Sequence, residues 1–305
     1  MLRQRILSTI KFFDLQDIPL TLLELHRFLL GDVNRISLSQ DGNGELFKDA
    51  PLGGENPKAG LDEILLCLQN ECSREVDNTL GYYHFFGREQ IVHRRLNNYF
   101  FGLKRERRIR RFLVGLRHIP FVRGAAVGGS QSLGQQKSTS DIDLFIVTEP
   151  GFMWLARTVI SFYFQVLGLR RHGKKIVNRF CLNHYVAGAK PVDRERNLYK
   201  AMEYARLRPL IYPQGVAQFL QKNLDWIQIY FPNFYTDNGK EAQSMVQGAF
   251  ETILKNPFGQ MLERVLGFIQ KHKIHEDEFT FVLEDELSFH PHSQHRMLLS
   301  KFFNS

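Results

Sequence analysis

Residues 121–151 constrain the fold of this chain more than any other stretch of its sequence. A short apolar run at residues 125–127 leads into Gly-Gly-Ser at 128–130, and after ten mostly polar residues comes a second run, DIDLFIV, at 141–147. Short apolar or alternating runs bounded by glycine and polar residues are typical of strands. The sequence therefore predicts two strands joined by a glycine turn and a polar connection.

Asp141 and Asp143 begin the second predicted strand. Side chains alternate between the two faces of a strand, so both carboxylates are expected on one face. The opposite face is apolar, with Ile142, Leu144 and Ile146. Two neighbouring carboxylates repel each other and are costly to bury without a cation. Because oxygen ligands suit Mg²⁺, which commonly bridges to substrate phosphates, the pattern predicts a magnesium site here.

The glycine turn is a candidate phosphate-binding element. Glycine lets the backbone approach a ligand closely. If Ser130 opens a helix over residues 131–133, the free backbone N–H groups there would hold a phosphate. A phosphate site beside paired carboxylates is the arrangement that phosphoryl and nucleotidyl transfer require. The candidate nucleotide-binding residues are therefore Gly128, Gly129 and Ser130, and Ser140, directly before the second strand, is a further candidate.

Gly129-Ser130, ten intervening residues and Asp-Ile-Asp-Leu at 141–144 resemble the signature of the DNA polymerase β-like nucleotidyltransferase superfamily. The wider layout is similar to a bacterial subgroup with a winged-helix-like N-terminus and a helical C-terminus. The resemblance implies that Asp141 and Asp143 are the catalytic residues and bind one or two Mg²⁺ ions. It also implies that Gly129 and Ser130 contact the phosphates of a nucleoside triphosphate, whose nucleoside monophosphate passes to a hydroxyl as pyrophosphate leaves.

Members of this superfamily commonly carry a third carboxylate on a neighbouring strand, as a general base. The next predicted strand, RFCLNHYV at residues 179–186, contains no acidic residue. Alternation divides it into one face with Cys181, Asn183 and Tyr185 and another with Phe180, Leu182 and His184. Asn183 stands where the acid is expected, and an amide cannot take a proton.

Three explanations for the missing acid stay open. His184 could be the base, although a structural histidine is the commoner role in a strand. Glu203 could reach the site from a helix predicted at residues 198–212, although it could also be an ordinary surface acid. Alternatively, the protein binds nucleotide and does little chemistry.

Residues 1–100 are expected to form a winged-helix-like module, with helices at 2–13, 20–30 and 61–76 and a hairpin at 79–87. In winged helices, the helix before the wing commonly reads DNA. Here residues 62–77 hold five acidic side chains and one basic side chain, which opposes an approach to phosphates. A structural or protein-contact role is therefore favoured over DNA binding.

Two segments concentrate positive charge. KRERRIRRF, at residues 104–112 of a long helix predicted at 90–119, has six basic side chains in its first eight positions. RRHGKK, at 170–175, is expected in a loop. Each segment fits either a strip that binds nucleic acid or phosphate, or an ordinary solvated surface.

Composition fits a globular protein with anionic partners. The chain of 305 residues is 43% hydrophobic and 24% charged, with a formal net charge of +8. Three cysteines, Cys67, Cys72 and Cys181, are too few for a disulfide framework and favour a reducing, cytoplasmic location. The apolar stretch at 151–169 contains Arg157, so we expect a buried helix and no membrane partner.

The sequence predicts an α+β protein with a winged-helix-like module at 1–100, a nucleotidyltransferase core with a mixed sheet at 101–190 and a helical region at 191–305. The expected function is Mg²⁺-dependent transfer of a nucleoside monophosphate from a nucleoside triphosphate to an unidentified hydroxyl, with nucleic acid among the candidate partners. The alternative is a catalytically degenerate protein that binds nucleotide or nucleic acid. A plain protein-interaction adaptor is the third interpretation.

Overall fold

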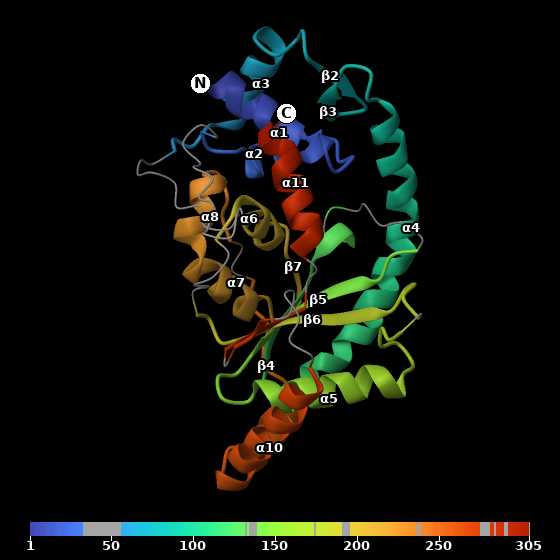
Figure 1. Cartoon of the computed structure of the whole chain (residues 1–305), viewed down its shortest axis with the longest axis vertical. Helices are drawn as coiled ribbons and strands as arrows, with labels where there is room; N and C mark the ends of the chain where they lie inside the picture. The colour runs from blue at the N-terminus through green and yellow to red at the C-terminus, as the bar shows by residue number, and fades with distance from the viewer. Residues whose placement is uncertain are drawn as a thin grey trace.

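The chain folds into a mixed α+β structure, as predicted (Figure 1). The computed structural model describes residues 1–32, 56–131, 133, 139–173, 175–190, 196–236, 239–274, 281–283, 285–289 and 292–304. Most of the loop expected at residues 39–60 lies outside these ranges.

A six-stranded sheet forms the centre of the molecule. Its strands lie in the order β7-β4-β5-β6-β9-β8. They are β4 (Val122–Val127), β5 (Ile142–Thr148), β6 (Phe180–Ala187), β7 (Arg208–Ile211), β8 (Phe281–Val282) and β9 (Glu286–Ser288). β5 and β6 are parallel, whereas every other pair is antiparallel, so the prediction of a mixed sheet is confirmed.

The N-terminal segment forms three helices and a small sheet. They are α1 (Leu2–Asp14), α2 (Leu22–Arg27), α3 (Leu61–Asn70), β1 (Leu20–Thr21), β2 (Val76–Thr79) and β3 (Tyr82–Phe85). Thr21 starts α2 with a capping box, because its side chain accepts from the Glu24 amide and the Glu24 carboxylate accepts from the Thr21 amide. A helix or hairpin is present in each predicted range, although α3 ends at Asn70, β2 begins at Val76, and Leu20–Thr21 form a strand. The assignment to a winged-helix class remains a prediction.

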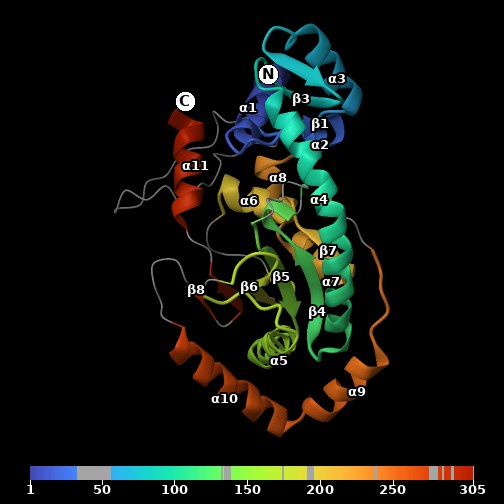
Figure 2. The ribbon, with the colours of Figure 1, turned by 90° about the vertical axis from the view of Figure 1, so that its right-hand side faces the viewer.

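The long helix α4 (Gln90–Leu113) joins this segment to the central sheet (Figures 1 and 2). The short 3-10 helix η2 (Val114–His118) continues it. The buried side chains of α4 include Ile91 and Val92 at one end and Ile109 and Leu113 at the other. Only the second pair belongs to the core beneath the sheet, so the two ends of α4 are anchored in different parts of the molecule.

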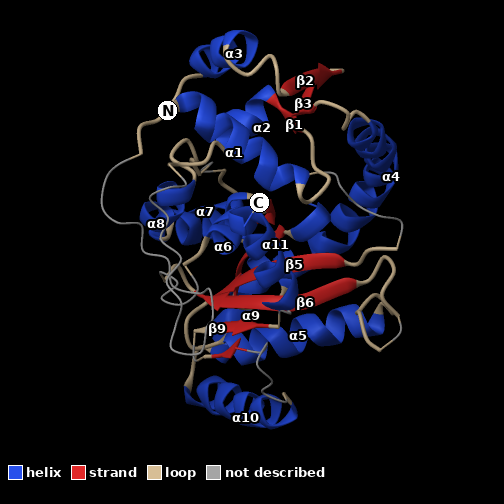
Figure 3. Ribbon diagram, turned by 45° about the horizontal axis from the view of Figure 1, so that its top comes forward, coloured by secondary structure: helices blue, strands red, loops and turns tan. Residues whose placement is uncertain are grey.

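Helices cover both faces of the sheet (Figure 3). One face packs against α5 (Met153–Val166), which in turn packs against α10 (Pro257–Lys273); α9 (Met245–Leu254) precedes α10. The other face packs against α7 (Pro213–Lys222) and its neighbours α6 (Leu198–Ala205), α8 (Leu224–Tyr230) and α11 (His292–Asn304). The predicted buried helix is present as α5, which is buried on one side only, since Phe162 and Val166 are 69% and 67% exposed. In the described part of the chain, the helices are too short or too polar to cross a membrane.

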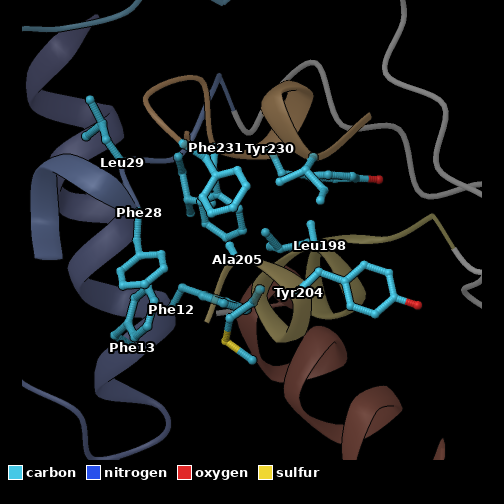
Figure 4. Packing of buried hydrophobic residues seen from close by; sticks show 14 of the residues in the cluster. Phe12, Phe13, Phe28, Leu29, Leu198, Tyr204, Ala205, Tyr230 and Phe231 are labelled. Carbon is cyan, nitrogen blue, oxygen red and sulfur yellow. The ribbon is translucent and has the colours of Figure 1, made fainter. Parts of the chain in front are cut away.

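One apolar core connects the N-terminal helices to the upper face of the sheet. Phe12 and Phe13 of α1 lie in the same cluster as Tyr204 of α6 and Phe145 of β5. Figure 4 shows part of this cluster, with Phe28 beside Phe231. Burial of each such side chain contributes about 1.5–3 kcal/mol, so residues 1–32 are held firmly against the central part of the chain.

The region at 191–305, predicted as helical, contains α6 to α11 but is not helical throughout. This range supplies β7, β8 and β9 to the central sheet. The helix predicted at 198–212 ends at Ala205, and Pro209 lies in β7. Because β7 is an edge strand, the amide N–H that proline lacks is not required for pairing on its open side.

Candidate functional site

The two predicted metal ligands lie together at the start of β5. Asp141 immediately precedes the strand and Asp143 lies within it. One carboxylate oxygen of each, together with the Cys181 Sγ, lies within 4.8 Å of the others. Ile142 packs in the core below the sheet, which leaves both carboxylates on the opposite face. The alternation predicted for this strand therefore places the pair as expected.

A buried arginine fixes the chain as it enters β5. Arg105 of α4 is 8% exposed, and its Nη2 donates to the backbone oxygens of Ser140 and Asp141 at 2.5 and 2.6 Å. The Asn178 amide also donates to the Ser140 oxygen, at 3.1 Å. Ser140, a predicted nucleotide-binding residue, thus positions the site through its carbonyl group.

The glycine turn lies directly against Asp143. The Gly128 amide donates to the Asp143 backbone oxygen at 3.1 Å, and Gly129 has a φ of +58°. The 3-10 helix η3 (Gly129–Gln131) follows as a single turn, which is the described part of the helix expected after Ser130. The backbone of Ser130 belongs to this turn, and its side chain lies outside the described atoms.

Glycine at 129 is required by this contact, which gives a first prediction. A Cβ atom at position 129 would lie 2.4 Å from the Asp143 Oδ2, in a backbone conformation that L-residues rarely adopt. Gly129→Ala should destabilise the fold by roughly 1–3 kcal/mol, measured by urea unfolding. Gly173→Ala is the matched control, because Gly173 also has a positive φ but its Cβ would meet open space. Equal losses of unfolding free energy in the two variants would contradict the contact between residue 129 and Asp143.

An irregularity in β6 changes which residues face the site. Asp143 pairs with Cys181, whereas Phe145 pairs with His184, so β6 advances three residues while β5 advances two. As a result His184 lies on the same face as Phe145, and Tyr185 packs in the core on the other face. The division of this strand by simple alternation was therefore wrong for His184 and Tyr185. The Asn183 side chain lies outside the described atoms.

The structure places His184 in the core. Its Nε2 lies 3.1 Å from the Glu286 Oε1 of β9, and its ring packs edge-on against Phe145 with centroids 4.8 Å apart. Burial lowers the pKa of His184 and so favours the neutral ring. This position fits a structural histidine better than a general base beside Asp143.

Glu203 approaches the carboxylate pair from α6. Asn197 caps this helix, since its side-chain oxygen accepts from the Lys200 amide at 2.8 Å. Leu198, Ala201 and Met202 face the core and orient the helix over the sheet. The negative charge of Glu203 contributes to the raised pKa of Asp143, and Lys200 Nζ lies 3.5 Å from Glu203.

Burial and the neighbouring carboxylates make Asp143 costly to ionise. Burial, and then the charges of Asp141 and Glu203, raise the pKa of Asp143 from 3.8 to about 7, against the opposing effect of Arg171 and Arg105. Burial and the charge of Asp143 likewise raise the pKa of Cys181 to about 12. The thiol therefore stays neutral, and the two carboxylates supply the ionisable oxygens of the cluster.

Basic side chains surround these carboxylates. Arg171 Nη1 lies 2.5 Å from the Asp141 Oδ2 and 3.1 Å from the Cys181 Sγ, so the segment 170–175 does reach the site. Buried Arg206 donates to the Gly129 backbone oxygen at 3.2 Å. The carboxylate oxygens and the raised pKa of Asp143 fit a divalent cation such as Mg²⁺, which would compete with Arg171 for the Asp141 carboxylate.

Two pockets lie near the ends of β4. One, of about 400 Å³, lies between the N-terminal segment, α4 and η3, and it is lined in part by Tyr82, Tyr99 and Gln131. The other, of about 380 Å³, lies at the opposite end of β4 and β5, beside Arg123 and Thr148. Neither is lined by Asp141 or Asp143, but the first adjoins the glycine turn through Gln131.

The sequence predicted the carboxylates and the turn but missed three partners: Cys181 opposite Asp143, Arg105 beneath the strand and Arg171 on Asp141. For Arg105 and Arg171, the only signal in the sequence was the concentration of basic residues at 104–112 and 170–175. Comparisons with family models, curated proteins and solved structures found no match to this chain.

Proposed function

We propose that this protein is a Mg²⁺-dependent nucleotidyltransferase. One observation carries the proposal: the carboxylates of Asp141 and Asp143 converge on a glycine turn whose backbone touches Asp143. Paired acids next to exposed backbone are what a metal-bound triphosphate needs. When bound, Mg²⁺ would neutralise negative charge on the phosphates.

The residues present support each part of such a transfer. Asp141 and Asp143 would hold the metal, and the backbone at 128–130 would hold phosphate oxygens. Arg171 pairs with Asp141 in the structure. Once a cation occupied the Asp141 carboxylate, the Arg171 side chain would turn toward the phosphates. The acceptor oxygen attacks the α-phosphorus, the bond from that phosphorus to the bridging oxygen breaks, and pyrophosphate leaves.

Glu203 is the residue we assign to the acceptor proton. Among the described carboxylates outside the Asp141–Asp143 pair, Glu203 is the one whose charge contributes to the raised pKa of Asp143. Glu203 lies on α6 rather than on a strand. Glu203→Gln keeps the shape but cannot take a proton, so we expect a loss of transfer of about 10²–10⁴-fold. His184→Gln is the comparison, and it should lose far less. A larger loss for His184→Gln than for Glu203→Gln would reverse the assignment.

The function itself is tested by incubating the protein with each α-³²P-labelled nucleoside triphosphate, Mg²⁺ and cell extract. We expect label to pass from one or more triphosphates to an acceptor, with pyrophosphate released. EDTA should abolish the transfer. No transfer with Mg²⁺ or Mn²⁺, under conditions where the labelled triphosphate binds, would contradict the enzyme.

A second function is favoured by one observation. Cys181, which stays neutral, occupies the position opposite Asp143 on the neighbouring strand. A core with two carboxylates and a neutral thiol on the neighbouring strand, in place of a third acid, would bind a nucleotide without transferring it. Saturable triphosphate binding that depends on Asp143, in the absence of any label transfer, is the result expected for that function.

A further inference from the structure

One face of α4 presents a continuous exposed stripe. Spacings of three and four residues along a helix place side chains in a row. The members of this α4 stripe are all exposed: His93, Asn97, Phe100, Phe101, Lys104, Arg107, Arg108 and Arg111. The stripe covers 18 helical steps, about 27 Å at 1.5 Å per residue.

The cations of the α4 stripe have no acidic partners among the described residues. Glu106, the one acid within residues 104–112, is engaged on another side of the helix, where it pairs with Arg110 and Arg208. Lys104, Arg107, Arg108 and Arg111 form no ion pair in the part of the chain that the structure describes. Four adjacent cations on one exposed face favour a polyanion.

The stripe also exposes two large aromatic rings. Phe100 and Phe101 are 69% and 65% exposed, one turn before the basic residues. Exposed aromatic rings beside cations are the combination that single-stranded nucleic acids use, because unpaired bases stack on rings while phosphates meet arginine and lysine. A duplex offers no free base faces, so the aromatic rings favour a single strand.

The α4 stripe shares its helical turns with a residue that contacts the candidate site. Arg105, which holds the Asp141 backbone, has Phe101 four residues before it and Arg108 three residues after it. Arg105 is buried in line with Gly102 and Ile109, so it contacts the Asp141 backbone from the side of α4 that faces the protein, whereas the stripe lies on the solvent side of the same turns. A strand lying on the stripe would therefore pass one helix diameter, about 10 Å, from the entrance to β5.

We infer that the α4 stripe binds single-stranded nucleic acid and that a terminal hydroxyl of this strand is the acceptor at the carboxylate pair. The second part rests on the proposed function. An anionic membrane would also be attracted by the cations, but the link through Arg105 to Asp141 favours a strand that ends at the site.

The test is fluorescence anisotropy of the full chain with labelled 20-nucleotide single-stranded RNA and DNA of mixed sequence. Replacing Arg107, Arg108 and Arg111 together with alanine should weaken binding by at least about tenfold and reduce the salt slope by about two, at 0.7 per lost phosphate contact. Replacing Phe100 and Phe101 with alanine should also weaken binding about tenfold but leave the salt slope unchanged.

The matched control replaces three exposed basic residues of α10, Arg264, Lys271 and Lys273, with alanine. This variant should bind like the wild type. Asp143→Asn should also bind normally while losing transfer, which separates this inference from the proposed function. Equal binding by the α4 and α10 variants, or binding to phosphatidylserine vesicles but not to either oligonucleotide, would overturn the inference.

Discussion

Asp143→Asn is expected to reduce nucleotidyl transfer by about 10³-fold, the upper end of the range for removing one group that stabilises a transition state. The amide is nearly the same size as the carboxylate, so the contact with Gly129 is preserved. What is lost is the negative charge that would hold the cation beside Asp141. The measurement is initial rate of label transfer at saturating Mg²⁺.

Asp225→Asn is the control for this experiment, because Asp225 is an exposed acid on α8, away from β5. It should retain the wild-type rate. An Asp143→Asn variant that keeps more than about a tenth of the rate would mean that Asp143 does not carry the metal, since a tenfold change is only 1.4 kcal/mol.

The same substitution should stabilise the metal-free protein at alkaline pH. The pKa of Asp143 is about 7 in the folded chain, against 3.8 when unperturbed, so the folded state keeps a proton that the unfolded state releases. Stability therefore falls as pH rises from about 4 to about 7, and the loss is complete above that range. Asparagine has no such proton, so Asp143→Asn should be more stable than the wild type by roughly 2–4 kcal/mol at pH 8.

Urea unfolding in EDTA at pH 4 and pH 8 measures this effect. The two proteins should have similar unfolding free energies at pH 4 and should separate at pH 8. Added Mg²⁺ should stabilise the wild type selectively, because a bound cation favours the ionised carboxylate. If the variant and the wild type have equal unfolding free energies at both pH values, ionisation of Asp143 does not destabilise the folded protein.

The central features of the site were predictable because they are local. Alternation along 141–147 was enough to place Asp141 and Asp143 on one face and Ile142 in the core. The Gly-Gly-Ser sequence was enough to expect a turn, and the turn is present at Gly129 with a positive φ. Both inferences depend on residues within a few positions of each other.

The partners contributed from a distance were not predictable. That Cys181 pairs with Asp143 depends on the register of β5 with β6, and that His184 lies on the Phe145 face depends on an irregularity in this pairing; no single-strand pattern contains either. Arg105 and Arg171 reach Asp141 and its flanking backbone from segments 36 and 30 residues away. Their charge was visible in the sequence, but their proximity to the carboxylates was not.

The limits of helical periodicity explain the remaining errors. The helix predicted from Leu198 was expected to be ended by Pro209, yet it ends at Ala205 and the chain turns into β7, because an edge of the sheet is available to pair with it. Tertiary pairing of this kind overrides local propensity. For the same reason β8 and β9 were not anticipated in a region that is otherwise helical.

The most direct test of the account is a crystal structure of the protein with Mn²⁺ and a non-hydrolysable nucleoside triphosphate. Anomalous scattering should place Mn²⁺ between the carboxylates of Asp141 and Asp143, with the triphosphate against the backbone at 128–130 and Arg171 moved away from Asp141. A metal and nucleotide bound elsewhere, with the Arg171–Asp141 pair still closed, would contradict the account.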